Sequence, residues 1–288
     1  MQAAQKSPIW TRKYADGTCA CGSAKPARIC CYDTTKKVWY KKPAVISVPN
    51  SAKHSHPKCI FSHRNECNEK ISREHYFSKA ILKQFGNLTI SGFDWLNGQT
   101  RNISIKSMAS NILCENHNNI LSPLDKSAAI FFEAMLNMGR PSEVAENKHD
   151  LYVVSGIDIE RWLLKAFCGA LGAKALIDAE KNKRGIQDIK AEWLDMIINP
   201  TLWDPPQGMY IRGELNEKIP LSNSLGMACA TAIDDPEVVG GAMFQIAGFE
   251  IALVLHDTMS TKHEQWHYRI SNFIHKDNKK RRAIIFTW

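Results

Sequence analysis

The cysteines of this chain are concentrated in its first part, and their placement constrains the fold more than any other feature. Seven of the nine cysteines precede residue 115, in close groups with polar and basic neighbours. In a protein of the cytosol, such groups are typical of metal ligands rather than of disulfides. The other two, Cys168 and Cys229, have apolar neighbours and are expected to be buried thiols.

The first group occupies thirteen residues. Its members are Cys19, Cys21, Cys30 and Cys31. Four thiolates at this spacing can supply a closed tetrahedral Zn²⁺ site, and Gly22 and Ser23 follow the first pair, where the chain must turn back sharply. Because so short a loop has no core of its own, metal binding is expected to supply most of its folding free energy.

This string closely resembles the SEC-C zinc motif, which reads C-x-C-G-S-G, then a short spacer, then C-C or C-H. The ligand positions and the Gly-Ser pair match, and Ala24 stands where the family usually has glycine. The resemblance implies an adaptor module that binds a protein or a nucleic acid. It implies no catalytic role, because four thiolates leave the metal without an open position.

The second group is spread over a longer segment. Its proposed ligands are Cys59, Cys67, Cys114 and His117. Two ligand pairs separated by a long excursion can staple distant segments around one structural zinc ion. His63 is an alternative to Cys67 as a ligand, and Cys67 is preferred because thiolates dominate structural zinc sites.

Three further side chains near the second group are candidates for catalysis. Glu74 directly precedes His75, and Asn118 directly follows a proposed ligand. Carboxylate and carboxamide oxygens are hard ligands that suit Mg²⁺ or Mn²⁺. A neutral imidazole beside such a metal can act as a general base near neutral pH.

With these residues in view, the segment 57–130 resembles the HNH (ββα-metal) endonuclease family, in the branch with a zinc staple. That branch has the order C…C, (D/E)-H, a hairpin, then N-(L/I)-x-x-C-x-x-C-(H/N)-N. The resemblance implies that His75 activates water and that Glu74 and Asn118 bind one catalytic Mg²⁺ or Mn²⁺. Asn111 resembles the middle residue of the motif, which orients the histidine.

The chain departs from this family pattern in three respects. His117 replaces the usual second cysteine, and the first ligand pair is more widely spaced than C-x2-C. The distance along the chain from the histidine to Asn111 is also long. A hairpin at Asn97 and Gly98, joining strands near residues 88–90 and 103–105, is predicted to account for it.

The predicted fold class is α+β. It comprises a basic SEC-C-like zinc module at residues 1–50, an HNH nuclease domain at 51–140 and an accessory domain at 153–288. Residues 141–152 are polar and are predicted to be a linker. In the accessory domain, helices are followed by antiparallel strands. The helices are predicted at residues 157–171 and 186–198, and the strands at 209–211, 238–244, 249–255, 268–274 and 283–288.

A further helix is predicted after the second cysteine group. Ser122 as the N-cap, Pro123 at the first helical position and Asp125 at the third form a capping-box pattern. Asp125 is therefore interpreted as a capping acid rather than as a metal ligand.

The charge of the chain is uneven. Its formal net charge is +8, yet residues 1–65 contain twelve Lys or Arg residues and only Asp16 and Asp33 as acids. A basic first part suggests a polyanion partner, because release of counterions from phosphates favours binding. Arg73 and the basic run at residues 276–282 have two interpretations, phosphate contact or solvated surface.

The leading hypothesis is a DNA endonuclease with little direct base readout, because no helix-turn-helix or finger array is present in the sequence. One alternative is a catalytically silent zinc adaptor that binds nucleic acid or protein, and another is an HNH nuclease that cleaves RNA. The expected location is the cytoplasm, without membrane association, since the first residues lack an apolar signal segment and residues 240–255 are too short and polar to span a bilayer. Oligomeric state is left open.

Overall fold

The computed structural model describes residues 14–48, 54–85, 89–91, 99, 101–102, 108–138, 150–176, 189–213, 224–235, 237–256, 265–276 and 281–288. Among these, the α-helices are α2 (Lys79–Leu82), α3 (Glu115–Met138), α4 (Gly156–Gly172) and α5 (Ala191–Ile198). The strands of the first half are β1 (Tyr32–Asp33), β2 (Val38–Trp39), β3 (Ile71–His75), β4 (Thr89–Ser91), β5 (Arg101–Asn102) and β6 (Ala109–Cys114). Those of the second half are β7 (Leu151–Ser155), β8 (Gly208–Arg212), β9 (Ser224–Thr231), β10 (Val239–Ile246), β11 (Phe249–Val254), β12 (Trp266–Tyr268), β13 (Asn272–Lys276) and β14 (Arg281–Thr287). Helix and sheet are mixed, in agreement with the predicted α+β class.

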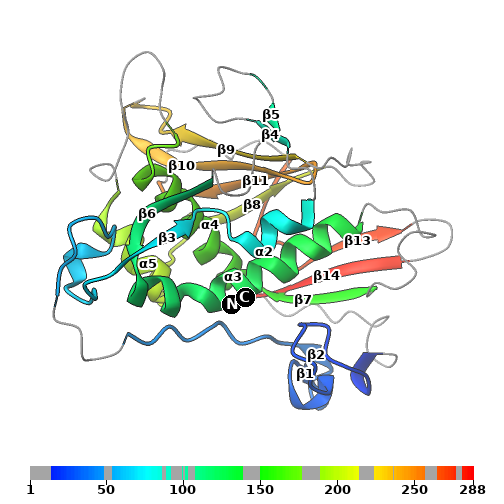
Figure 1. The fold of residues 1–288 in the computed structure, drawn as a ribbon. Helices are drawn as coiled ribbons and strands as arrows, with labels where there is room; N and C mark the ends of the chain where they lie inside the picture. Colours follow the sequence, from blue (N-terminus) through cyan, green and yellow to red (C-terminus); the bar gives the residue numbers. More distant parts are fainter. Residues whose placement is uncertain are drawn as a thin grey trace.

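Helix α4 lies at the centre of the molecule. Of its 17 residues, only Ile157 and Gly172 are not buried. It packs against α3 on one side and against β11 of the largest sheet on the other (Figure 1). The hydroxyl of Ser155 caps the helix by accepting a hydrogen bond from the backbone N–H of Asp158. The helix predicted at residues 157–171 is thus confirmed to within one residue at each end.

The largest sheet has seven strands in the order β12-β8-β11-β10-β9-β4-β5. Neighbouring strands are antiparallel except β4 and β9, which are parallel and pair Ile90 with Leu225. Strand β9 was not predicted. Strands β4 and β5 pair in agreement with the predicted hairpin, but β5 lies just before the strand expected near residues 103–105. That segment and the turn at Asn97 and Gly98 lie outside the described residues. Because β4 and β5 belong to segment 51–140, this sheet joins two of the predicted domains.

The hydrophobic core also crosses the predicted domain boundary. The ring centroid of Trp162 in α4 lies 5.9 Å from that of Phe77 and 5.2 Å from that of Phe132 in α3. One continuous set of buried side chains extends from Cys59 to Phe286. The predicted boundaries therefore divide the sequence without dividing the core.

A second sheet has three strands in the order β13-β14-β7 (Figure 1). Strands β14 and β7 are parallel and pair Ala283 with Leu151 and Thr287 with Ser155, which corrects the expectation that all strands of this region are antiparallel. The predicted linker at residues 141–152 is also too long, because Leu151 begins a strand in which every residue is buried. A strand covered on both faces reads as a continuous apolar run and not as a linker.

The strand predicted at residues 268–274 is divided in the structure. Strand β12 ends at Tyr268 and β13 begins at Asn272, in different sheets. Between them Arg269 has a φ of 43°, in the left-handed region that interrupts an extended chain. Its guanidinium donates to both carboxylate oxygens of buried Glu160, at 2.9 and 3.0 Å. This ion pair fixes the turn against helix α4.

Strands β3 and β6 form an antiparallel pair, and α3 follows β6 without a gap (Figure 1). Helix α3 begins at Glu115, so the predicted N-cap at Ser122 is wrong and Pro123 lies inside the helix. The apolar face formed by buried Leu121, Leu124 and following residues packs into the core. That packing outweighs the hydrogen bond that a proline inside a helix cannot make.

None of the described helices has both the length and the apolar character needed to cross a bilayer.

Candidate metal centres and the hairpin-helix site

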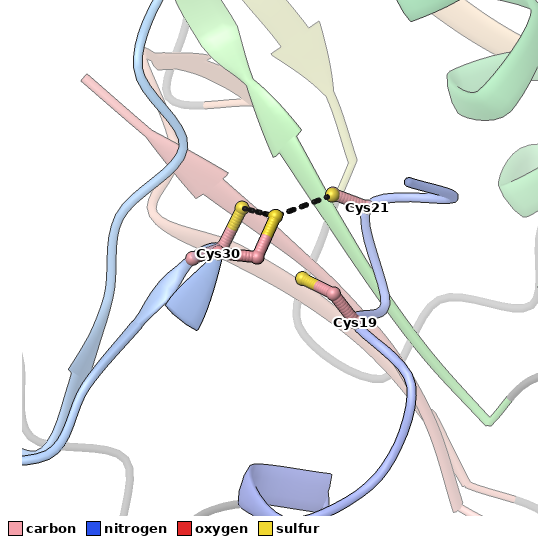
Figure 2. Close-up of side chains that lie close together, drawn as sticks. Cys19, Cys21 and Cys30 are labelled. Carbon is pink, nitrogen blue, oxygen red and sulfur yellow. Dashed lines mark hydrogen bonds between the residues drawn. The ribbon is translucent and has the colours of Figure 1, made fainter. Parts of the chain in front are cut away.

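The first cysteine group converges as its spacing predicts. The Sγ atoms of Cys19, Cys21, Cys30 and Cys31 all lie within 4.8 Å of one another. Figure 2 shows Cys19 and Cys21 on one arm of the loop, turned toward Cys30 on the other. Cys21 and Cys30 are 3.6 Å apart at sulfur, as are Cys30 and Cys31. Four sulfurs in this arrangement could hold one metal ion.

The turn between the two arms is built by local backbone geometry. Gly22 and Ala24 have φ angles of 75° and 59°, both in the left-handed region. The glycine takes this conformation without strain, and a backbone hydrogen bond of 2.7 Å from Cys19 N–H to the Lys25 carbonyl closes the turn. The Ser23 hydroxyl lies 3.1 Å from the Cys30 sulfur. The Gly-Ser pair thus folds the loop so that its two arms face each other.

The protonation of these sulfurs depends on whether a cation is bound. Hydrogen bonds from Cys19 and Cys31 hold the pKa of Cys21 far below that of an ordinary thiol. The hydrogen bond with Cys21 correspondingly raises the pKa of Cys19 to about 11. Without a cation the cluster therefore keeps protons, because adjacent thiolates repel. A bound metal ion would displace them and allow every sulfur to ionise.

The module around this group is docked on the body of the protein. The backbone N–H of Val153 in β7 donates to the carbonyl of Ala20 at 3.0 Å. Cys19, Cys21 and Cys31 share a cluster of buried side chains with Leu151, Val153 and Ala283 of the three-stranded sheet. A methyl group at Gly22 would lie 3.0 Å from Ile130 of α3. The module therefore shares a buried cluster with the three-stranded sheet.

The second group also assembles. The ligand atoms of Cys59, Cys67, Cys114 and His117 all lie within 4.8 Å of one another, and all four residues are buried. The Nδ1 atom of His117 lies 3.1 Å from the sulfur of Cys114 and 3.6 and 3.7 Å from those of Cys59 and Cys67. This set could hold a second metal ion.

Cys67, and not His63, belongs to the second group. The Nε2 atom of His63 lies 3.7 Å from Asp195 instead. The ring of Phe61 stacks on the His117 ring with centroids 4.8 Å apart. The Nε2 atom of His117 is 3.9 Å from Glu66, which is too long for a hydrogen bond.

Burial prepares the second group for a metal ion. It lowers the pKa of His117 to about 4, so the ring is neutral at pH 7 and can offer a lone pair. It raises the pKa of Cys59 and of Cys67, so these thiols hold their protons until a cation arrives. The other two cysteines of the chain lie apart from both groups: Cys168 is buried as expected, whereas Cys229 is only half-buried.

The candidate catalytic residues lie on the β3-β6 pair and on the first turn of α3. His75 ends β3 opposite Ala109, and its Nε2 atom is shielded from solvent. Asn111 is exposed on β6 at an irregularity in the pairing with β3, near exposed Arg73. Asn118 is half-buried and directly follows the candidate ligand His117.

Glu74 lies in an ion cluster that the sequence did not indicate. Its Oε1 atom accepts a 2.7 Å hydrogen bond from the ammonium group of Lys165 in α4. The same ammonium group donates to both carboxylate oxygens of Asp125 in α3, at 2.7 and 2.9 Å. The indole N–H of Trp162 donates to Asp125 at 3.0 Å. Asp125 is therefore not a capping acid, because α3 begins well before it.

Lys165 is the functional candidate that sequence reasoning missed. The signal was its position, since it lies on the same face as Trp162 in a helix that is otherwise strongly apolar. A lysine at a core position requires a carboxylate partner. Burial alone would lower the pKa of Lys165, but the two carboxylates outweigh it and raise this pKa.

The structure does not place Glu74 beside Asn118 through any contact that it records in the described chain. Glu74 is bound at the level of Asp125, which follows Asn118 by seven residues in the same helix. That separation is about two helical turns, or roughly 10 Å along the axis. Asp125 is thus the helical side chain that shares a partner with Glu74.

No family model matches this chain, and no curated protein or solved structure matches it.

Proposed function

We propose that the chain is a metal-dependent endonuclease of the HNH type, with DNA as the preferred substrate. The observation that carries the proposal is the order β3, β6, α3. A Glu-His pair ends β3, and two of the four candidate zinc ligands, Cys114 and His117, lie where β6 meets α3. This arrangement has the strand, strand, helix order that the family resemblance implies.

Zinc is the metal we propose for both cysteine groups. Thiolate and imidazole are soft or borderline ligands, and sets of four sulfurs or of three sulfurs and one nitrogen are typical of structural zinc. With four protein ligands in each group, a zinc ion there would have no open coordination position for chemistry. A separate Mg²⁺ or Mn²⁺ ion, held by oxygen ligands, is proposed for catalysis.

In this proposal, His75 acts as the general base. Its imidazole accepts a proton from a water molecule while the water oxygen forms a bond to phosphorus and the bond to the 3′ oxygen breaks. Glu74 is the carboxylate ligand and Asn111 orients the histidine, whereas Asn118 is left out of the ligand set because no recorded contact of the described chain brings it beside Glu74. A divalent cation bound there would stabilise the charge on the phosphate oxygens.

The basic first part of the chain is proposed to hold the phosphate backbone. In the described residues, Lys25, Arg28, Lys36, Lys37 and Lys42 are exposed on or beside the cysteine module. Contacts of this kind give affinity with little sequence preference. The module also presents Ile29, which is 70% exposed, and this apolar side chain supports a protein partner as the second possibility for the module.

A catalytically silent adaptor is the second candidate function. It is favoured by one observation: in the described chain no recorded contact brings Asn118, the expected amide ligand, beside Glu74. The adaptor would use the same zinc modules and the same exposed basic residues to bind nucleic acid without cutting it.

The deciding experiment is incubation of the zinc-loaded protein with supercoiled plasmid in Mg²⁺, in Mn²⁺ and in EDTA. We expect nicking with a divalent cation, none in EDTA, and loss of nicking in His75→Ala. His267→Ala is the matched control, since His267 is exposed and bonded to a backbone carbonyl 2.9 Å away in another part of the fold. A wild type that binds the plasmid without cutting supports the adaptor, and cleavage of RNA alone moves the substrate to RNA.

A further inference from the structure

The ion cluster in the core calls for an explanation beyond stability. Lys165 is 3% exposed and Glu74 is 8% exposed, so both charges have left water almost completely. Desolvation of an ammonium group and a carboxylate costs several kcal/mol for each ion. An apolar side chain at position 165 would fill the same space at lower cost. We therefore look for the role of Lys165 in the carboxylates that its ammonium group binds.

The geometry of the cluster is asymmetric. The ammonium group of Lys165 donates two hydrogen bonds to Asp125 and one to Glu74. Asp125 also accepts a hydrogen bond from the indole N–H of Trp162, whose ring packs against Phe132, so Asp125 has two donors that fix its position. The Glu74 carboxylate is held by Lys165 through one oxygen, which leaves lone pairs on the carboxylate for another ligand.

The charges in the cluster do not balance. Two carboxylates face one ammonium group, so the cluster carries one excess negative charge when all three groups are ionised. Glu74 directly precedes His75, the proposed general base, at the end of β3. A bound cation would offset the excess charge at the place where the proposed chemistry needs it.

We propose that Lys165 is a positioning residue of the nuclease centre, whose ammonium group, fixed on Asp125, holds the Glu74 carboxylate in place for a divalent cation. This inference rests on the proposed function. Without Lys165, the two buried carboxylates repel each other, and Glu74 turns away or takes up a proton. Outer partners of this kind fix the direction of a metal ligand, and their loss lowers metal affinity or activity about 10- to 100-fold.

The test compares Lys165→Met and Asp125→Asn with the wild type, all loaded with zinc. Mn²⁺ binding is measured from the electron paramagnetic resonance signal of free Mn²⁺, beside plasmid nicking and thermal unfolding. We expect both variants to bind Mn²⁺ about 10- to 100-fold more weakly and to nick more slowly, with an unchanged zinc content. Asp125→Asn keeps the side-chain shape and an acceptor for Trp162, so it carries the test if Lys165→Met does not fold.

The matched control is Glu160→Gln, which removes a buried carboxylate on the same helix that is paired with Arg269. It is expected to lose stability and to keep its Mn²⁺ affinity, which separates positioning from general destabilisation. Unchanged or tighter Mn²⁺ binding in the folded Lys165→Met variant would overturn the inference, because it would make the ammonium group a bystander or a competitor of the cation. Such a result in an active wild type leaves the nuclease proposal standing, whereas a wild type that neither cuts nor binds Mn²⁺ refutes both.

Discussion

The backbone N–H of Val153 donates a 3.0 Å hydrogen bond to the carbonyl of Ala20 and ties the first cysteine group to strand β7. The loop that carries this group has little secondary structure, and its contacts with the sheet depend on the position of its cysteines. A metal ion bound at the first group would thus be coupled to the packing of the three-stranded sheet. This coupling leads to the first of four predictions.

Replacement of Cys31 by Ser is expected to destabilise the whole protein and not only its loop. Loss of a structural metal ligand costs more than about 2 kcal/mol, which in a chain of this size lowers Tm by roughly 4–8 °C. Thermal unfolding with elemental analysis checks this. The control is Cys229→Ser, at a half-buried cysteine outside both groups. Equal Tm values for wild type and Cys31→Ser would show that the sheet does not depend on the metal.

The protein without its metal is expected to lose stability in acid because of His117 in the second group. Burial lowers the pKa of His117 to about 4, whereas an unfolded histidine has a pKa near 6.5, so the unfolded state binds the proton first. Stability is therefore fully present above about pH 6.5 and is lost as the pH falls toward 4, by an amount on the order of 3 kcal/mol. Urea unfolding of chelated protein between pH 7 and 4.5 measures this slope. His117→Gln should flatten it, and an unchanged slope in that variant would assign the effect elsewhere.

Arg161 of α4 is expected to be among the most sensitive positions for stability. Its fully buried guanidinium donates to the carbonyls of Ile197, Ile198 and Ala44, at 2.7, 2.8 and 2.8 Å. Arg161→Met leaves these carbonyls without their donor and removes the charged partner of buried Asp158, at a cost of about 3–5 kcal/mol. Chemical denaturation quantifies the loss, with exposed Arg212→Met as the control, for which about 1 kcal/mol or less is expected. Similar losses in the two variants would contradict the assigned role.

Gly156 begins α4 against the ring of Trp288. A Cβ atom at this position would lie 2.5 Å from two ring carbons, closer than any normal contact. Gly156→Ala is therefore expected to destabilise the fold by about 1–3 kcal/mol. Gly17→Ala is the matched control, since its nearest neighbour would be 3.9 Å away. Calorimetry of the two variants should show a lower Tm for the first alone.

The sequence was most informative where a pattern is local. The cysteine groups could be predicted because ligand spacing is a short-range property, and α4 could be predicted because its apolar content and its cap lie within one segment. The start of α3 was predicted incorrectly because the capping pattern at Ser122 and Pro123 is real as a sequence but is overridden by tertiary packing. Local capping energies of about 1 kcal/mol are smaller than the burial of a long apolar face.

Long-range relationships could not be predicted. Nothing near Lys165 in the sequence indicates that its partners are Glu74 and Asp125, which come from two other elements. Strands β7 and β14 pair in parallel although strands β8 to β12 of the large sheet lie between them in the sequence. An apolar run such as residues 151–155 has no periodicity that distinguishes a linker from a strand. These features depend on how elements meet in space, which a single sequence does not encode locally.

The position of β14 has a consequence for the order in which the protein forms during synthesis. Strand β7 ends at Ser155 and its parallel partner begins at Arg281, so a ribosome adds more than a hundred residues between them. At about 5–20 residues per second, this takes on the order of ten seconds. Throughout that interval Leu151 and Val153 have their cysteine loop available but not their neighbouring strand. The nascent chain therefore passes through a stage in which an unpaired apolar edge is exposed, and cellular factors that shield such edges have their main opportunity there.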